Sequence, residues 1–144
     1  MRISTKGRYA IKLMLDLATN DNGEPIRLKD VARRQEISEK YLEQIISVLN
    51  KAKFVKSVRG AQGGYILTKR PDEYTVGMIL RLTEGSLAPV ACVEESESCE
   101  KFHDCATALV WHKMNEAINQ VVDHMTLQDL VDYEQRNCCD DYVI

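Results

Sequence analysis

Apolar residues recur at helical spacing near the start of the chain. They are Ala10, Leu13, Met14, Leu17 and Ala18. Intervals of three and four residues place them along one side of a helix, so we expect that side to be buried. Ser4 or Thr5 can cap the N-terminus of this helix, because a side-chain hydroxyl accepts a hydrogen bond from the first turn.

The same spacing occurs twice more between residues 26 and 49, and the alternation typical of strands follows it. Leu28, Val31 and Ala32 predict a short helix. Ser38 is a good N-cap for a second helix, whose buried side is expected to consist of Leu42, Ile45, Ile46 and Leu49. Residues 54–59 alternate, residues 60–64 are rich in glycine, and residues 65–68 complete a predicted β-hairpin. Two helices and a hairpin indicate a helix-turn-helix with a wing; a module used only for packing is the alternative.

Three further helices are expected after the hairpin. Thr75 can cap the first of them, and a long helix runs from about Cys105 to Met125. Thr126 and Asp129 then resemble a capping box that opens a short last helix. Residues 90–104 predict a loop, and residues 137–144 predict a mobile tail. The predicted fold is therefore mainly α with a small β-hairpin wing, a winged helix-turn-helix domain plus a long dimerisation helix.

The long helix carries an apolar stripe along its length. The stripe consists of Val110, Trp111, Met114, Ile118, Val121, Val122 and Met125. A helix outside the N-terminal core must bury such a stripe on another surface, and a symmetry-related copy is the simplest one. Packing within the chain is the alternative. We expect a homodimer, with a DNA-binding domain (1–84), a cysteine-containing loop (85–104), a dimerisation helix with the short last helix (105–136), and a tail (137–144).

The distribution of charge matters more than the net charge of −3. Residues 1–70 hold 15 Lys and Arg against 7 Asp and Glu, whereas residues 71–144 hold 4 against 15. A basic half indicates a partner rich in phosphate, and double-stranded DNA suits a helix-turn-helix. No apolar run is long enough to cross a bilayer, and no charged-then-apolar leader opens the chain, so we expect a cytoplasmic protein with no membrane partner. Nothing in the sequence suggests a substrate pocket, so we expect no enzymatic activity.

Polar side chains gather at the N-terminal end of the second helix of the helix-turn-helix. They are Ser38, Lys40, Tyr41, Glu43 and Gln44. This end of a recognition helix points into the major groove, where glutamate can accept from the cytosine amino group and glutamine can pair with adenine. Tyr41 either bonds a phosphate or packs against its neighbours.

Basic residues outside that helix are candidates for contacts with the DNA backbone. Arg59 is expected at the hairpin tip, where it can reach a phosphate or the minor groove. Arg2, Lys6 and Arg8 belong to the start of the first helix and could lie along the backbone. A solvated helix face is the alternative for each of them.

Three cysteines, Cys92, Cys99 and Cys105, follow the pattern Cys-x6-Cys-x5-Cys. Thiolates are soft ligands suited to iron–sulfur clusters or zinc, so we predict a metal site at the junction between the wing domain and the long helix. Redox-active thiols and thiols without a function are the alternatives. No cysteine has an obvious base and orienting group, which argues against a catalytic nucleophile. For the adjacent Cys138 and Cys139, incidental exposed thiols are favoured first and redox sensing second, since a bridge between neighbours is strained.

Four segments resemble the Rrf-two family of bacterial transcription regulators. They are residues 1–9 (MRISTKGRY), 41–44 (YLEQ), 58–65 (VRGAQGGY) and 126–130 (TLQDL), which follow the family order along nearly the whole chain. The resemblance implies a winged-helix homodimer with a crossed dimerisation helix, bound to a two-fold operator. It also implies that Glu43, Gln44 and Arg59 take part in DNA recognition.

The resemblance extends to the cysteines. In iron–sulfur regulators of this family the matching loop holds a cluster, which implies an iron–sulfur cluster, preferably of the 2Fe-2S type, on Cys92, Cys99 and Cys105. The chain departs from the family pattern: the first spacing is one residue longer, Ala108 replaces a histidine ligand, and Arg8 replaces an aspartate ligand. The fourth ligand therefore stays open between His103, Asp104, His112, a group of the partner chain and an exogenous thiol.

These features predict a homodimeric DNA-binding transcription regulator that senses iron–sulfur status. One alternative is a repressor of cysteine and sulfur metabolism that acts with cysteine synthase. The ending, residues 140–144 (DDYVI), resembles the tails of such members and implies capture of Ile144 in the substrate cleft of that enzyme, although a terminus without a partner is favoured slightly. An alternative from another class is a zinc-stabilised interaction module.

Overall fold

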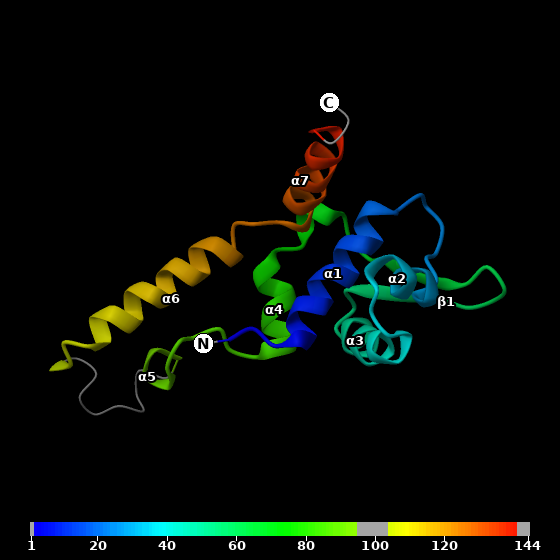
Figure 1. Ribbon diagram of the computed structural model, residues 1–144. Coiled ribbons are helices and arrows are strands. Elements are labelled where there is room, and N and C mark those ends of the chain that lie inside the picture. The colour runs from blue at the N-terminus through cyan, green and yellow to red at the C-terminus, as the bar shows by residue number, and fades with distance from the viewer. Residues whose placement is uncertain (1, 95–103, 141–144) are drawn as a thin grey trace.

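The computed structural model describes residues 2–94 and 104–140, with a helical core, a hairpin on one side and a long helix that projects from the other side (Figure 1). The helices are α1 (Thr5–Thr19), α2 (Leu28–Gln35), α3 (Glu39–Lys51), α4 (Val76–Glu84), α5 (Ala91–Glu94), α6 (Ala108–Val122) and α7 (Leu127–Asp140), with a 3-10 turn η1 (Pro71–Glu73) before α4. The strands β1 (Val55–Val58) and β2 (Gly64–Leu67) form the antiparallel hairpin. This confirms the predicted class, mainly α with a hairpin wing.

Helix α1 lies at the centre of the core and contacts α2, α3, α4 and α7. Ala10, Leu13, Met14 and Leu17 of its stripe are buried as predicted, and Ala18 is partly buried against the same core. From α3, the same core receives Leu42, Ile45, Ile46 and Leu49. Each large apolar side chain removed from water in this way stabilises the fold by about 1.5–3 kcal/mol before chain entropy is counted.

Local caps set where the first helices begin. Ser4 Oγ accepts from the Gly7 N–H (3.1 Å), and Ser38 Oγ accepts from the Tyr41 N–H (3.1 Å), as the sequence predicts. The turn between α2 and α3 lacks a glycine, and Glu36 takes the left-handed conformation there with φ 54°. Ile37 follows it and is buried in the core, so the turn is held by packing.

One buried carboxylate joins α1 to the helix-turn-helix. Asp16, only 2% exposed, accepts two hydrogen bonds from the Arg34 guanidinium (2.7 and 3.0 Å) and one from Gln35 Nε2 (2.9 Å). The hydrogen bond to Asp16 raises the pKa of Arg34 above its ordinary value. Three N–H donors therefore satisfy this buried carboxylate, and those from Arg34 are charged and so form strong hydrogen bonds. Arg34 therefore has a structural role.

The wing is a short ladder in which Val55 pairs with Leu67 and Val58 pairs with Gly64. Ile26 adds one bridge on the outer side of β2, through hydrogen bonds between the Ile26 and Tyr65 backbones of 2.9 and 2.8 Å. A side chain at Gly64 would collide with the Ile26 carbonyl, so this close approach requires glycine. The strands agree with the predicted hairpin to within a residue at each end.

The base of the wing is pinned by Tyr74, which is fully buried between η1 and α4. Its hydroxyl donates to the Phe54 carbonyl (2.6 Å) and accepts from the backbone N–H groups of Thr68 and Lys69 (3.1 Å each). One side chain therefore holds together the two chain segments at the base of the hairpin, the one before β1 and the one after β2.

We expect Tyr74→Phe to lower the free energy of unfolding by about 1–3 kcal/mol, because buried backbone groups lose their hydrogen-bond partner. Chemical denaturation of the full chain measures this change. Tyr133→Phe is the matched control, since Tyr133 is 60% exposed on α7 and its hydroxyl has water available. Equal losses in the two variants would contradict the role given to Tyr74.

The second half of the chain differs from the expectation in three places. Residues 91–94 form the one-turn helix α5 within the predicted loop. The long helix runs from Ala108 to Val122, three residues shorter at each end than the predicted Cys105 to Met125. Helix α7 continues to Asp140, so residues 137–140 are helical where a tail was expected. The capping box is confirmed, with Thr126 N–H donating to Asp129 Oδ2 (2.9 Å) and Asp129 N–H donating to Thr126 Oγ1 (3.1 Å).

Helix α7 returns to the N-terminal core. Leu127 is fully buried with the α1 and α3 side chains, and Thr19 Oγ1 donates to Glu134 Oε2 (3.0 Å). By contrast, Figure 1 shows α6 extending away from the core, with α5 beside its far end.

Candidate nucleic-acid interface and cysteine segment

The first two turns of α3 form an exposed polar surface. Ser38, Lys40, Glu43 and Gln44 are all exposed, while Leu42 and Ile45 on the opposite side are buried. The burial of one side fixes the rotation of the helix, and this rotation turns Glu43 and Gln44 outward. These side chains can reach base edges in a major groove that receives the helix.

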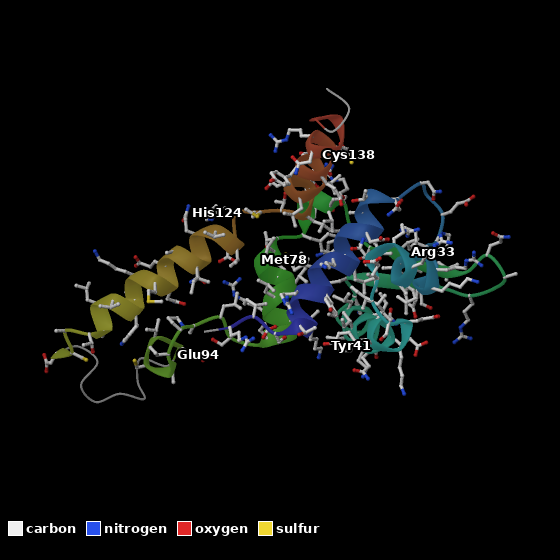
Figure 2. All side chains as sticks on the ribbon, viewed as in Figure 1. Arg33, Tyr41, Met78, Glu94, His124 and Cys138 are labelled. Atoms are coloured by element: carbon white, nitrogen blue, oxygen red, sulfur yellow. The ribbon has the colours of Figure 1, made fainter. Side chains whose placement is uncertain are left out.

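Tyr41 takes the packing alternative within the chain. It is half-buried, and its ring lies edge-on to Tyr9 of α1, with centroids 5.5 Å apart and planes at 89°. Lys12 Nζ lies 5.7 Å from the Tyr9 ring. This aromatic pair links the start of α3 to α1, and Figure 2 shows Tyr41 at the edge of the core.

The predicted basic residues do not all gather in one place. Arg59 is exposed where the wing turn begins, and Arg8 is exposed on α1 with Nη2 donating to Thr5 Oγ1 (3.3 Å). Lys6 is half-buried on the same helix. Arg2 instead lines a groove between α4 and α6 together with Ile3 and Glu84. The structure thus separates Arg2 from the exposed surface of α3.

Two exposed basic residues of α2 were not among the predicted contacts. Lys29 and Arg33 face solvent, and Arg33 is 3.7 Å from the Asp30 carboxylate with its side chain 76% exposed (Figure 2). The first helix of a helix-turn-helix crosses the DNA backbone, so cations there suit phosphate contacts. The sequence could have indicated them, because Lys29 and Arg33 lie two positions before and after the buried Val31 and therefore on the opposite side of the helix.

Two of the three predicted cysteine ligands lie in the described part of the chain. Cys92 is half-buried on α5, and Cys105 is exposed two residues before the Thr107 cap of α6, with its Sγ 3.0 Å from Thr107 Oγ1. Helix α5 packs against α6, which brings these two segments to the same end of α6. Cys99 and His103 lie outside the described residues, and within residues 2–94 and 104–140 no three His, Cys, Asp or Glu side chains converge on a metal-sized centre.

The position of this segment differs from the prediction. Cysteines at the junction of the wing domain and the long helix were expected, but Figure 1 places α5 and the start of α6 on the side of the molecule opposite the wing. Cys138 lies on α7, far from α5 (Figure 2), and is exposed. Asp104 and His112, two of the open fourth ligands, lie near Cys105 in the chain and are exposed.

Helix α6 keeps much of its apolar stripe uncovered. Val110, Met114, Val121 and Met125 are 51, 38, 57 and 40% exposed, and Leu109 is 62% exposed. Ile118 and Val122 instead pack towards Leu80 and Leu87 of the α4 region. Ile118 and Val122 thus follow the alternative of packing within the chain, whereas the outer part of the stripe stays uncovered in the protomer.

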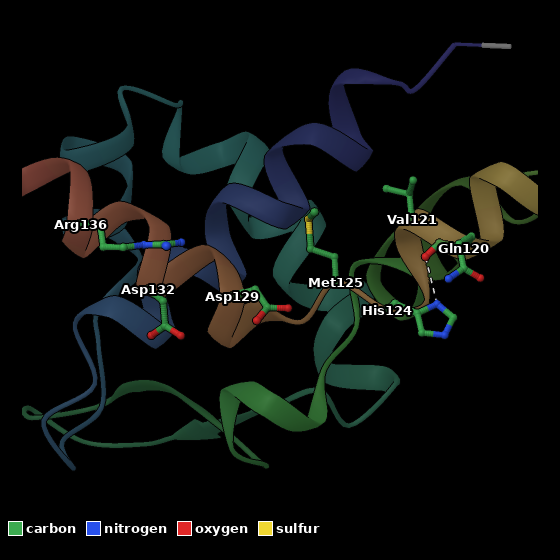
Figure 3. Close-up of a pocket in the computed structure, with 7 residues that line it drawn as sticks. All are labelled: Gln120, Val121, His124, Met125, Asp129, Asp132 and Arg136. Atoms are coloured by element: carbon green, nitrogen blue, oxygen red, sulfur yellow. Dashed lines mark hydrogen bonds between the residues drawn. The ribbon is translucent and has the colours of Figure 1, made fainter.

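Two hollows flank Val121. The groove that contains Arg2 has a volume of about 510 Å³ and is lined by Leu80, Leu87, Ala117 and Ile118. The other, of about 720 Å³, lies between the end of α6 and α7 (Figure 3). In Figure 3, Asp129, Asp132 and Arg136 lie on the α7 side, Val121 and His124 lie on the α6 side, and Met125 lies between them. His124 is hydrogen-bonded to the Gln120 carbonyl.

In the part of the chain that the structure describes, none of the helices is both long enough and apolar enough to cross a bilayer.

A helix-turn-helix with an exposed polar recognition helix, followed by a wing, defines a winged-helix DNA-binding protein. The family described as "Rrf2: Iron-dependent Transcriptional regulator" matches residues 3–133. The chain belongs to this family, as the sequence resemblance predicted.

Named relatives agree with this assignment. The chain is 41% identical to the HTH-type transcriptional regulator CymR of Bacillus subtilis, over 92% of this chain and 91% of the relative. It is 38% identical to the HTH-type transcriptional regulator IscR of Pectobacterium atrosepticum, over 94% and 82%. The solved structure of CymR, the global cysteine regulator of B. subtilis, superposes with a TM-score of 0.79, covering 92% of this chain and 98% of that chain. These relatives are transcription regulators and not enzymes.

Proposed function

We propose that the chain is a cytoplasmic homodimeric transcription regulator that binds a two-fold DNA operator and senses iron–sulfur status. The uncovered outer part of the α6 stripe supports the dimer, because exposed apolar side chains at helical spacing suit a symmetric partner. The exposed side chains of α3, with Arg59 of the wing, support reading of one half-site by each copy.

The observation that carries the sensing proposal is the placement of Cys92 and Cys105 at one end of α6. Two thiols on packed neighbouring segments, with Cys99 between them in the chain, form a donor set that fits an iron–sulfur cluster. Cys92, Cys99 and Cys105 would hold the group, with a fourth ligand from the set left open above. When bound, a cluster supplies redox and oxygen sensitivity; the chain's own part is to fix the position of the thiolates beside α6.

Iron and acid-labile sulfide analysis of anaerobically purified protein tests this proposal. Iron and sulfide in equal amounts support a cluster. Iron-free protein with stoichiometric zinc would favour a structural metal site, and the added absence of operator binding would favour the zinc-stabilised interaction module.

A second candidate is a repressor of cysteine metabolism, supported by the 41% identity to CymR. In this case cysteine synthase is the partner and Ile144 the residue it captures. Sedimentation of the protein mixed with cysteine synthase tests this second candidate. Deletion of Ile144 should abolish the complex between the two proteins. A complex that survives the deletion would exclude capture of the terminus. Absence of any complex with the parent protein would favour the iron–sulfur function.

Among DNA contacts, we expect Glu43→Ala to broaden the choice of base at one operator position with a small loss of affinity, because a carboxylate rejects bases that lack an amino donor. Arg59→Ala should weaken binding to all sequences alike. Competition binding with a randomised operator position measures both effects, and Glu24→Ala, an exposed loop carboxylate before α2, is the control for loss of negative charge.

Binding should also fall with salt, with a slope of about −0.9 in log K against log salt for each phosphate contact. If the dimer makes about six to ten such contacts, affinity falls by about 10³–10⁵ between 50 and 200 mM salt. Titrations across that range measure the slope. Salt-independent binding would contradict the phosphate contacts.

A further inference from the structure

Helix α6 is fastened to the DNA-binding unit at its C-terminal end. At that end, the backbone after α6 pairs with the backbone before α4: Val76 N–H donates to the Met125 carbonyl and Leu127 N–H donates to the Tyr74 carbonyl, both at 2.9 Å. Tyr74 is itself buried and pins the wing. The end of α6 is therefore tied to the element that carries the wing, while its far end projects from the core (Figure 1).

A polar clamp crosses from α4 to α6 beside this tie. Arg81 Nη1 donates to Asp123 Oδ1, and Arg81 Nη2 donates to Asp123 Oδ2 (3.2 Å) and to Asn119 Oδ1 (2.8 Å). The guanidinium thus contacts two successive turns of α6, and a planar fork with several donors restrains direction as well as distance. Hydrogen bonding to Arg81 lowers the pKa of the Asp123 carboxyl, so the clamp is charged at neutral pH.

The clamp lies over a buried glycine of α4. A Cβ atom at Gly77 would collide with Asp123 Oδ1 and Arg81 Nη1, and it would press on the Val122 carbonyl at 3.1 Å. Only glycine lets the end of α6 approach α4 this closely. Gly77, Arg81, Asn119 and Asp123 together define one contact between the two helices.

Because α6 is held at one end, a small change in its angle at the clamp produces a larger displacement of its far end. The 15 residues of α6 span about 22 Å, so a change of about 10° at the clamp moves the far end by about 4 Å. In DNA, one base pair advances about 3.4 Å along the axis, and the half-sites of a dimer must match its geometry. A change of about 10° in the angle between α4 and α6 therefore displaces the far end of α6 by about the length that one base pair adds to the operator.

We infer that Arg81, with Asp123 and Asn119, is a positioning residue that sets the half-site spacing the dimer accepts. This inference rests on the proposed dimeric, operator-binding function. The clamp does not touch DNA in this role; it fixes the direction of α6 relative to the winged helix. Loss of the clamp should leave each half-site reader intact and loosen the distance between them.

The test uses an operator selected from a random two-fold DNA library with the parent protein, and versions with one base pair added or removed at the centre. We expect the parent to prefer its own spacing by about tenfold or more, similar to the penalty for a mismatched pair. Arg81→Ala and Asp123→Ala should reduce this preference to below about threefold, and Arg81→Lys, which keeps the charge without the fork, should lie between. Arg70→Ala is the matched control, because it removes an exposed ion pair with Asp72 (3.2 Å) away from α6.

Sedimentation and thermal unfolding of the same proteins separate positioning from stability. A variant that remains dimeric and folded but loses spacing preference supports the inference. A variant with the spacing preference of the parent, or with losses equal at every spacing, overturns it. A parent protein that is monomeric or binds no selected DNA would instead overturn the proposed function.

Discussion

Met114→Asp should convert the protein from a dimer to a monomer and abolish binding to a two-fold operator. Met114 lies at the middle of α6 and is 38% exposed in the protomer. It belongs to neither buried cluster of the described residues, so the substitution leaves those clusters intact. In a symmetric seam each copy would bury an unpaired carboxylate, at a cost of several kcal/mol. Such a cost weakens association by about 1,000-fold or more. Sedimentation at micromolar concentration measures the mass, and operator titration measures the consequence for DNA.

Glu116→Lys is the control for a change of charge at an exposed position on the same helix; it changes the charge by two, whereas Met114→Asp changes it by one. Residue 116 lies two positions after Met114, about 200° around the helix and therefore on its opposite side. The Glu116→Lys protein should remain dimeric. A Met114→Asp protein that is still dimeric would place the seam elsewhere. Ile118 is a less decisive site, because it packs towards Leu80 and Leu87 within the chain.

The local features of the fold were predictable because they depend on residues close together in sequence. Ser4 and Ser38 each cap a helix by accepting from a backbone N–H three residues further along, and the capping box of Thr126 and Asp129 has the same span. Apolar spacing likewise predicted the buried sides of α1 and α3, since period and burial are linked directly. The exposed positions of Glu43 and Gln44 follow from the same period.

The contacts that relate one element to another could not be predicted in this way. The pair of Asp16 and Arg34 and the clamp of Arg81 and Asp123 join residues on different helices. Either arginine could have been a DNA contact by charge alone. Only the folded arrangement separates these structural arginines from exposed ones such as Arg33.

The cysteine segment illustrates the same limit. Spacing identified Cys92 and Cys105 as a set, and the packing of α5 on α6 brings their segments to one end of that helix. Spacing did not predict the helix α5 or its side of the molecule, because a four-residue helix depends on what it packs against.

Protein purified without oxygen should be brown, and single substitution of Cys92, Cys99 or Cys105 by Ala should remove the colour and the bound iron. A cluster needs thiolate ligands, and each loss removes one of three from the same segment. Cys138→Ala and Cys139→Ala are the matched controls and should keep both, because Cys138 lies on α7, far from α5. Absorption spectra and iron analysis give the result. Colour and iron that survive all three single substitutions would exclude these ligands.

The apo protein should nevertheless fold and dimerise, because the large buried core formed by the described residues contains no cysteine and the α6 stripe needs no metal. Three thiolates in one segment repel each other unless metal or protons neutralise them. Loss of the cluster should therefore change the structure of the cysteine segment itself, beside α5 and the start of α6, and leave the rest of the protein unchanged. We expect the triple Cys92→Ala, Cys99→Ala, Cys105→Ala protein to keep its dimeric mass and melting behaviour but to lose any response to iron limitation at its promoters. Reporter expression through iron depletion and repletion measures this response. A triple variant that still responds as the parent does would show that another part of the molecule carries the signal, even if the parent binds a cluster.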